Sequence, residues 1–101
     1  MTAEARTERY RRVRGAILKM LANEHPGPID FVVLFKLMDD LRYTMTHEEL
    51  ESHLVYLEEK GCVRRETRKT TGVEIKLATI TPKGLDVLDG FVDECGVDTG
   101  F

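Results

Sequence analysis

The sequence predicts an α+β fold with three helices, a two-stranded hairpin and a final helix. Two observations carry this prediction. Apolar residues recur at helical spacing from Val13 to Leu57, and after Gly61 they alternate with a period of two. The chain has 101 residues, of which 42% are hydrophobic, enough for one modest core. We therefore expect a single domain over residues 1–101, with its core at about residues 10–95.

The first predicted helix is marked by an apolar stripe and ended by prolines. The stripe repeats at i, i+3, i+4, i+7 and i+8 and consists of Val13, Ala16, Ile17, Met20 and Leu21. The segment NEHPGP follows, and Pro26 and Pro28 cannot continue a helix. We expect the chain to fray at residues 1–8 and again at residues 96–101.

The second and third predicted helices each begin with a recognisable cap. Asp30 is the expected N-cap of the second helix. Its wide apolar surface should make it the most buried element, and that surface consists of Phe31, Val33, Leu34, Phe35, Leu37, Met38 and Leu41. In the third helix Thr46 and Glu49 have the spacing of a capping box, and Gly61 ends the helix.

A hairpin and a last helix complete the predicted order. CVRRET is the first strand, RKTTG the turn and VEIKLATI the return strand. The apolar parity changes near Leu77–Ala78, which predicts a bulge there. Thr81 caps the last helix with Pro82 at its first position. The apolar positions expected on this helix are Leu85, Leu88, Phe91, Val92 and Cys95. This order of elements is that of a winged helix-turn-helix domain.

Charge alternates along the chain. The net charge is -3, which argues against a general nucleic-acid binder. Residues 1–23 nevertheless carry +4 and residues 62–81 carry +3, whereas residues 24–61 carry -6 and residues 82–101 carry -4. The basic charge is therefore concentrated in the first helix and the hairpin.

Several classes of function find no support in the sequence. No apolar run is long enough to span a membrane and no secretory signal is visible, so we expect a cytoplasmic protein. Cys62 and Cys95 lack metal-site spacing, and we expect both to be reduced and semi-buried, although a disulfide stays open. Three histidines form no ligand set, and no catalytic motif is present. We therefore expect no metal, no cofactor and no enzyme activity.

Three groups of residues are candidates for contact with DNA or a partner. On the hairpin, the candidates for phosphate contact are Arg64, Arg65, Arg68, Lys69 and Lys76, with Arg68 and Lys69 at the tip. Placing Leu50, Leu54 and Leu57 inward turns the other face of the third helix outward, which predicts Glu48, Ser52 and Tyr56 as its DNA contacts. The exposed cations of the first helix, which could flank DNA or bind an acidic surface, are Arg11, Arg12 and Arg14.

Each group also has an ordinary structural explanation. Charged hairpins resist aggregation, and charged helix faces are commonly just solvated. Glu48 and Glu59 would repel phosphate, although a glutamate can accept a hydrogen bond from cytosine. The terminal helices carry apolar residues beyond the needs of the core and predict a homodimer through Tyr10, Leu88, Phe91 and Val92.

The segment from Leu54 to Gly84 resembles winged-helix regulators of the MarR, PadR and ArsR type. The matching positions are Leu54, Leu57, Glu58, Gly61, Cys62, Val63, Ile80, Thr81 and Gly84, within a likeness that covers about residues 10–92. The segments AILKML, LVYLEEKGCV and ATITPKGLDVL are also similar to a small ArsR-like winged-helix protein of Mu-like phages and prophages. The cysteine pairs and His/Asp clusters of metal-sensing ArsR proteins do not appear.

These resemblances imply a DNA-binding transcriptional regulator of phage or prophage origin. In such a protein the third helix would enter the major groove and the wing would grip the backbone. The alternative is a protein-interaction module in a phage or host assembly, whose acidic third helix docks a basic partner and does not read DNA.

Overall fold

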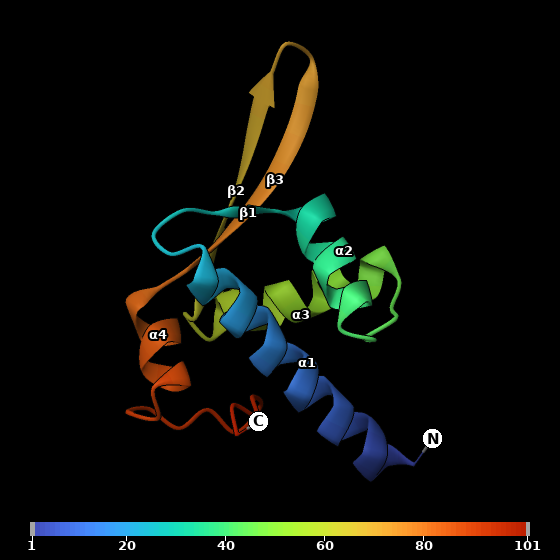
Figure 1. Cartoon of the computed structure of the whole chain (residues 1–101), viewed down its shortest axis with the longest axis vertical. Helices are drawn as coiled ribbons and strands as arrows, with labels where there is room; N and C mark the ends of the chain where they lie inside the picture. The colour runs from blue at the N-terminus through green and yellow to red at the C-terminus, as the bar shows by residue number, and fades with distance from the viewer. Residues whose placement is uncertain (1, 101) are drawn as a thin grey trace.

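The computed structural model describes residues 2–100, and Met1 and Phe101 lie outside the described residues. Its elements in chain order are α1 (Ala3–Asn23), β1 (Ile29–Asp30), α2 (Phe31–Asp40), α3 (His47–Glu59), β2 (Val63–Thr70), β3 (Val73–Ile80) and α4 (Pro82–Leu88). The four helices form one body from which the β2–β3 hairpin projects as a wing, with the N-terminus of α1 at the opposite end (Figure 1). The predicted winged helix-turn-helix fold is confirmed.

The core is built around α1 rather than α2. The fully buried side chains of α1 include Ile17, Leu18 and Leu21, and the helix contacts α2, α3, α4 and β3. In α2 only Leu34 and Met38 are buried, and Val32 and Val33 are exposed. The expectation that the second helix is the most buried element is therefore wrong. With only ten residues it lies at the edge of the body, and a single stripe of it reaches the core.

The sheet has three strands in the order β1-β3-β2. The sequence did not predict β1, a two-residue strand in which Ile29 pairs with Ala78. Pairing of β2 with β3 runs without interruption from Val63↔Ile80 to Thr70↔Val73, so the predicted bulge is absent. The apolar residues change from odd to even positions along β3 because the two faces of the strand are used in turn. Ala78 and Ile80 are buried on the face toward the core, whereas Val73, Ile75 and Leu77 lie on the other face.

The wing turns more tightly than expected. Its two-residue turn consists of Thr71 and Gly72, which have φ of 48° and 79°. Two successive positive φ values define a type I′ turn, whose twist matches that of the flanking strands. Arg68 and Lys69 therefore belong to β2, opposite Ile75 and Glu74, and do not form the tip.

The caps predicted from the sequence are present, but the last helix is shorter than expected. The Thr46–Glu49 capping box and the caps at Asp30 and Thr81 all form. However, α4 ends at Leu88 because Gly90 turns the chain with φ of 82°. Val92 and Cys95 consequently lie beyond the helix.

Each of the two segments expected to fray has contacts within the fold where it is described. At the N-terminus α1 already begins at Ala3. At the C-terminus Val97 is buried, and the backbone N–H of Asp98 donates to the carbonyl of Arg11 at 3.0 Å. The tail therefore packs back along α1 to at least Asp98.

The two cysteines differ in environment. Both are free, but Cys62 is buried in the core and Cys95 is exposed, so neither is semi-buried as expected. Burial raises the pKa of the Cys62 thiol. Among the described helices, none combines the length and the apolar character needed to cross a membrane.

Candidate nucleic-acid interface

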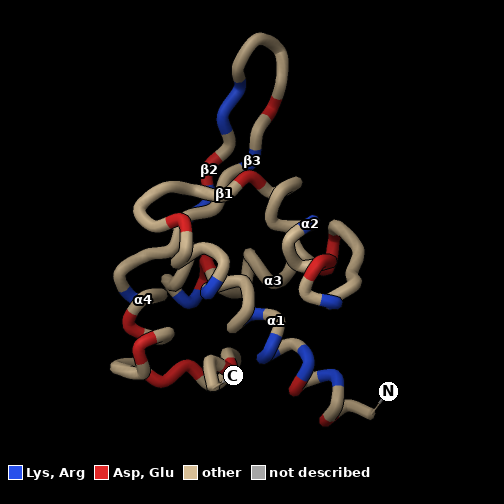
Figure 2. The backbone as a smooth tube through the Cα atoms, in the orientation of Figure 1, with Lys and Arg blue, Asp and Glu red and all other residues tan. Residues whose placement is uncertain are grey.

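The wing carries its cations on both faces. In the observed register Arg64 and Arg68 share one face, and Arg65, Lys69 and Lys76 share the other. Arg64, Lys69 and Lys76 are exposed and form no ion pair within the described part of the chain. Figure 2 shows basic and acidic positions along the projecting hairpin. The side chains of these three cations are free to meet a phosphate backbone.

Two wing arginines already have acidic partners. Arg68 pairs with Glu66 at 2.9 Å, but both side chains are largely exposed and the pair is therefore weak. Arg65 is half-buried and bridges two carboxylates of α3, Glu51 at 2.6 Å and Glu58 at 3.1 Å. Burial opposes the charge on Arg65, but the hydrogen bonds to these two glutamates outweigh it and raise its pKa. Arg65 therefore fastens the base of the wing to α3 and is not available to phosphate.

The outer face of α3 is acidic. Glu48, Ser52 and Glu59 are exposed on it, as predicted. Tyr56 does not share this face. The guanidinium of Arg14 lies 3.7 Å from the centre of its ring, and its hydroxyl lies against Gly96 of the tail. The expected role of Tyr56 in contacting DNA conflicts with this position, because α1 and the tail cover the ring.

The arginines of the first helix hold the C-terminal tail. Arg11 Nε donates to the carbonyl of Cys95 at 2.9 Å, and Arg14 Nη1 donates to that of Gly96 at 3.3 Å. Arg12 is exposed, as predicted, and pairs with Glu8 and Asp98. Arg11 and Arg14 are half-buried, which corrects the expectation that both are free surface cations. The Arg12–Asp98 pair joins the basic residues 1–23 to the acidic residues 82–101, whereas Arg11 and Arg14 bind backbone carbonyls, which the charge pattern of the sequence does not predict.

The environment of His53 was not predicted from the sequence. Its side chain is 5% exposed, and its Nδ1 accepts a hydrogen bond from Arg14 Nε at 3.2 Å. The ring of Tyr10 meets it edge to face with centroids 5.1 Å apart. Burial, reinforced by the charge of Arg14, lowers the pKa of His53 to about 4. His53 is therefore a neutral acceptor that joins α3 to α1.

A groove separates α3 from the wing. It has a volume of about 810 Å³ and is contiguous with a hollow of about 330 Å³ at the wing base, since both are lined by Phe31, Glu51 and Lys76. The charged residues of the larger part are Asp30, Glu48, Glu51, Glu74 and Lys76. The molecule thus places an acidic groove beside a wing with exposed cations.

Most of the predicted dimer residues are used within the molecule. Leu88 and Val92 are half-buried against the core, and Tyr10 is half-buried beside His53. Phe91 differs, with 80% of its surface exposed. Across residues 2–100 no cluster of three or more potential metal ligands occurs.

Comparison with known proteins supports the fold. No family model matches the sequence, and no curated protein matches it. Among solved structures, the chain resembles that of Bacillus subtilis PadR in complex with operator DNA, with a TM-score of 0.60 and 18% sequence identity. The match covers 87% of this chain and 52% of the PadR chain, so this chain spans about half the length of PadR. At this identity the likeness shows a shared winged-helix fold.

Proposed function

We propose that this protein is a DNA-binding transcriptional regulator of winged-helix type whose wing supplies most of its affinity. The observation that carries the proposal is the set of exposed cations on the projecting hairpin, namely Arg64, Arg68, Lys69 and Lys76. The PadR structure, which contains operator DNA, supports the use of this fold for DNA binding.

The chemistry of the wing suits the DNA backbone. The planar guanidinium groups of Arg64 and Arg68 can each donate two parallel hydrogen bonds to one phosphate. Lys69 and Lys76 add point charges on the opposite face of the hairpin. A narrow hairpin with cations on both faces can follow one strand or enter a minor groove.

The third helix contributes less to affinity than the wing. Ser52 can donate to a phosphate or a base, but Glu48 and Glu59 flank it with negative charge. Their carboxylates can accept a hydrogen bond from cytosine N4, but they repel phosphate. We therefore assign α3 to positioning the protein on the duplex, and the wing to sequence-independent attraction.

The test is the double variant Arg68→Ala, Lys69→Ala. Both side chains are exposed and contribute nothing to the core, so stability should be unchanged. Each lost phosphate contact lowers the slope of log affinity against log salt by about 1, so the slope should fall by about 2. Titration of a labelled duplex at several salt concentrations measures this.

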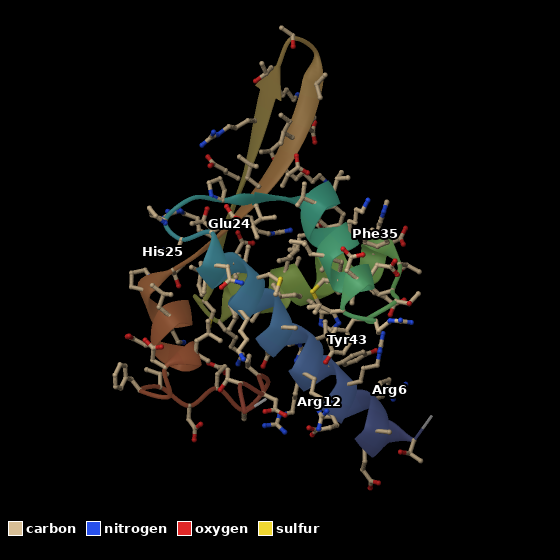
Figure 3. The ribbon with its side chains drawn as sticks, viewed as in Figure 1. Arg6, Arg12, Glu24, His25, Phe35 and Tyr43 are labelled. Carbon is tan, nitrogen blue, oxygen red and sulfur yellow. The ribbon has the colours of Figure 1, made fainter. Side chains whose placement is uncertain are left out.

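A matched control removes two cations elsewhere. Arg6 lies near the end of α1 remote from the wing (Figure 3), and Lys36 is exposed on α2. Arg6→Ala with Lys36→Ala changes the net charge equally and should leave the salt slope almost unchanged. Equal affinity and slope in the wing variant and the wild type would overturn the proposal.

The finer assignments are also proposals. The resemblance of AILKML, LVYLEEKGCV and ATITPKGLDVL to a Mu-like phage protein supports a phage or prophage origin. A regulator of such genes would act in the cytoplasm as a homodimer whose two α3 helices meet successive half-sites. The exposed ring of Phe91 supports the homodimer.

A further inference from the structure

The wing has an unpaired strand edge. The central strand β3 pairs with β2 along its whole length, but β1 covers only Leu77 and Ala78 on its other side. Between the turn and Leu77, that edge of β3 has no neighbouring strand among the described residues. An edge of this kind accepts an additional strand.

The register shows which backbone groups face this edge. In a two-residue hairpin the residues flanking the turn, Thr70 and Val73, form a hydrogen-bonded pair. Along β3 the backbone N–H and C=O groups of successive residues point to opposite edges of the strand. The groups of the odd-numbered residues therefore bond to β2. The N–H of Thr81 continues this pattern, because it donates to the carbonyl of Cys62. The N–H and C=O groups of Glu74 and Lys76 consequently face the open edge, in line with Ala78, which pairs with β1.

This edge forms one wall of the groove between α3 and the wing. The residues of β3 that line the groove are Val73, Glu74, Ile75 and Lys76. Its opposite walls come from the start of α2 and the first half of α3. Val32 is 72% exposed and Val73 is 57% exposed, so both present apolar surface at the groove. The groove therefore combines free backbone groups with exposed apolar side chains.

The charge of the groove determines what can enter it. Glu48 on α3 and Glu74 on β3 are exposed and form no ion pair within residues 2–100, whereas Glu51 is paired with Arg65. Lys76 is the single full cation of the lining, against the carboxylates of Asp30, Glu48, Glu51 and Glu74. Inside the groove a phosphate would be repelled by these carboxylates, whereas a cationic segment would be attracted.

We propose that this groove binds an extended, cationic segment of a partner protein, which adds to the free edge of β3 as a further strand. The backbone of the segment bonds to Glu74 and Lys76 in continuation of β1. Its cations lie near Glu48 and Glu74, and its alternate apolar side chains contact Val32 and Val73. This inference rests on the edge and the groove alone and does not depend on the proposed DNA binding.

The first experiment uses synthetic peptides with the full chain. The probe is a labelled peptide of alternating lysine and valine with blocked ends, and its control replaces every lysine with glutamate. Fluorescence anisotropy should show binding of the cationic peptide alone. In hydrogen exchange, the amides of Glu74 and Lys76 should become protected when this peptide binds. Equal binding of both peptides, or unchanged exchange at these two amides, would overturn the proposal.

Methylation of the peptide backbone tests strand addition without altering the protein. Along a strand, the N–H groups of alternate residues face opposite edges. One peptide is methylated at the nitrogen of every lysine, and a second at that of every valine. One of the two should lose binding and the other should retain it. An equal effect of both methylations would show that the peptide does not bind as a strand.

A pair of protein variants tests the charges of the groove. Glu48→Gln with Glu74→Gln should weaken binding of the cationic peptide by about tenfold. The control, Glu24→Gln with Glu59→Gln, removes two exposed carboxylates that do not line the groove and should change binding little. Equal weakening by both variants would overturn the assignment to the groove. Protection of the Glu74 and Lys76 amides from exchange by duplex DNA, but not by the peptide, would also overturn this assignment.

Discussion

At the scale of single residues, the arginines occupy two distinct environments. Arg14 and Arg65 are half-buried and hydrogen-bonded, the first to His53 and the tail, the second to two glutamates of α3. Arg64 and Arg68 extend from the wing into solvent. The planar guanidinium suits both environments, because it binds carboxylates, carbonyls and phosphates alike. Residue type alone therefore does not separate a structural arginine from one whose side chain is available to a phosphate.

His53 predicts a stability that depends on pH. Its folded pKa of about 4 lies below its ordinary value of 6.5, so the unfolded chain binds more protons in this range. The contribution of His53 to the free energy of unfolding is present above pH 6.5 and is lost as the pH falls toward 4. The difference in proton binding between the folded and unfolded states lowers the unfolding free energy by about 2 kcal/mol between pH 7 and pH 5. Urea denaturation of the wild type and of His53→Gln at both pH values should show a smaller loss in the variant. Equal losses would contradict this account of His53.

At the scale of elements, most boundaries follow from one or two local residues. Thr46 with Glu49 starts α3, Thr81 with Pro82 starts α4, and Gly61 ends α3 with φ of 78°. Gly84 shows how a local requirement can come from elsewhere in the chain. A Cβ at this position would collide with the carbonyl oxygen of Cys62, so the start of α4 can pack on the entry to β2 only with glycine.

The turn of the wing predicts a stabilising substitution. Thr71 is β-branched and adopts φ of 48°, a left-handed conformation that costs such residues about 1 kcal/mol. Asparagine tolerates this conformation and is preferred before glycine in type I′ turns. Thr71→Asn should raise the unfolding free energy by about 0.5–1 kcal/mol in chemical denaturation. Gly72→Ala, which introduces strain at φ of 79°, should lower it. A destabilised Thr71→Asn protein would mean that the hydroxyl of Thr71 has a role absent from this structure.

The acidic face of α3 predicts a gain of affinity from the loss of charge. If Glu48 and Glu59 only repel phosphate, Glu48→Gln with Glu59→Gln should strengthen binding to every duplex alike, by about threefold. If either one reads cytosine, the same change should reduce the preference among sequences instead. Titrations with a random duplex and a selected duplex distinguish these results. Weaker binding to all duplexes would show that α3 has a different role.

At the scale of the whole molecule, the tail and the exposed ring of Phe91 bear on assembly. Leu88 and Val92 are half-buried against the core, and Tyr10 is half-buried beside His53, all within one copy. Phe91, next to Val92 in the chain, is instead 80% exposed. A second copy is the simplest cover for such a ring in a two-fold arrangement.

We therefore predict a homodimer that depends on Phe91. Light scattering at tens of micromolar should give the mass of two chains. Phe91→Asp should shift the mass to one chain without unfolding the domain, because the ring lies outside the core. The control Val32→Asp changes another exposed apolar residue and should leave the mass unchanged. A monomeric wild type would contradict the dimer and, with it, binding to paired half-sites.

Local signals in the sequence determined most of the elements of this protein. Capping residues, the prolines and the change of period at Gly61 fix three helices, a hairpin and a fourth helix, because each acts over a few residues. They also placed Arg64 and Lys76 on the strands of the wing, where both are exposed. Gly90, which ends α4 with φ of 82°, is a further local signal of this kind.

Only the tertiary structure decided which charges are already paired. Arg65 meets Glu51 and Glu58, and Arg14 meets His53 and Gly96, through contacts between residues 7 to 82 positions apart. The pairing of β1 with β3 and the open edge beside it likewise depend on segments distant in sequence. Periodicity identifies the face of an element but not the neighbour opposite that face. The availability of a charge or a strand edge is set by that neighbour, and therefore by the packing of the whole chain.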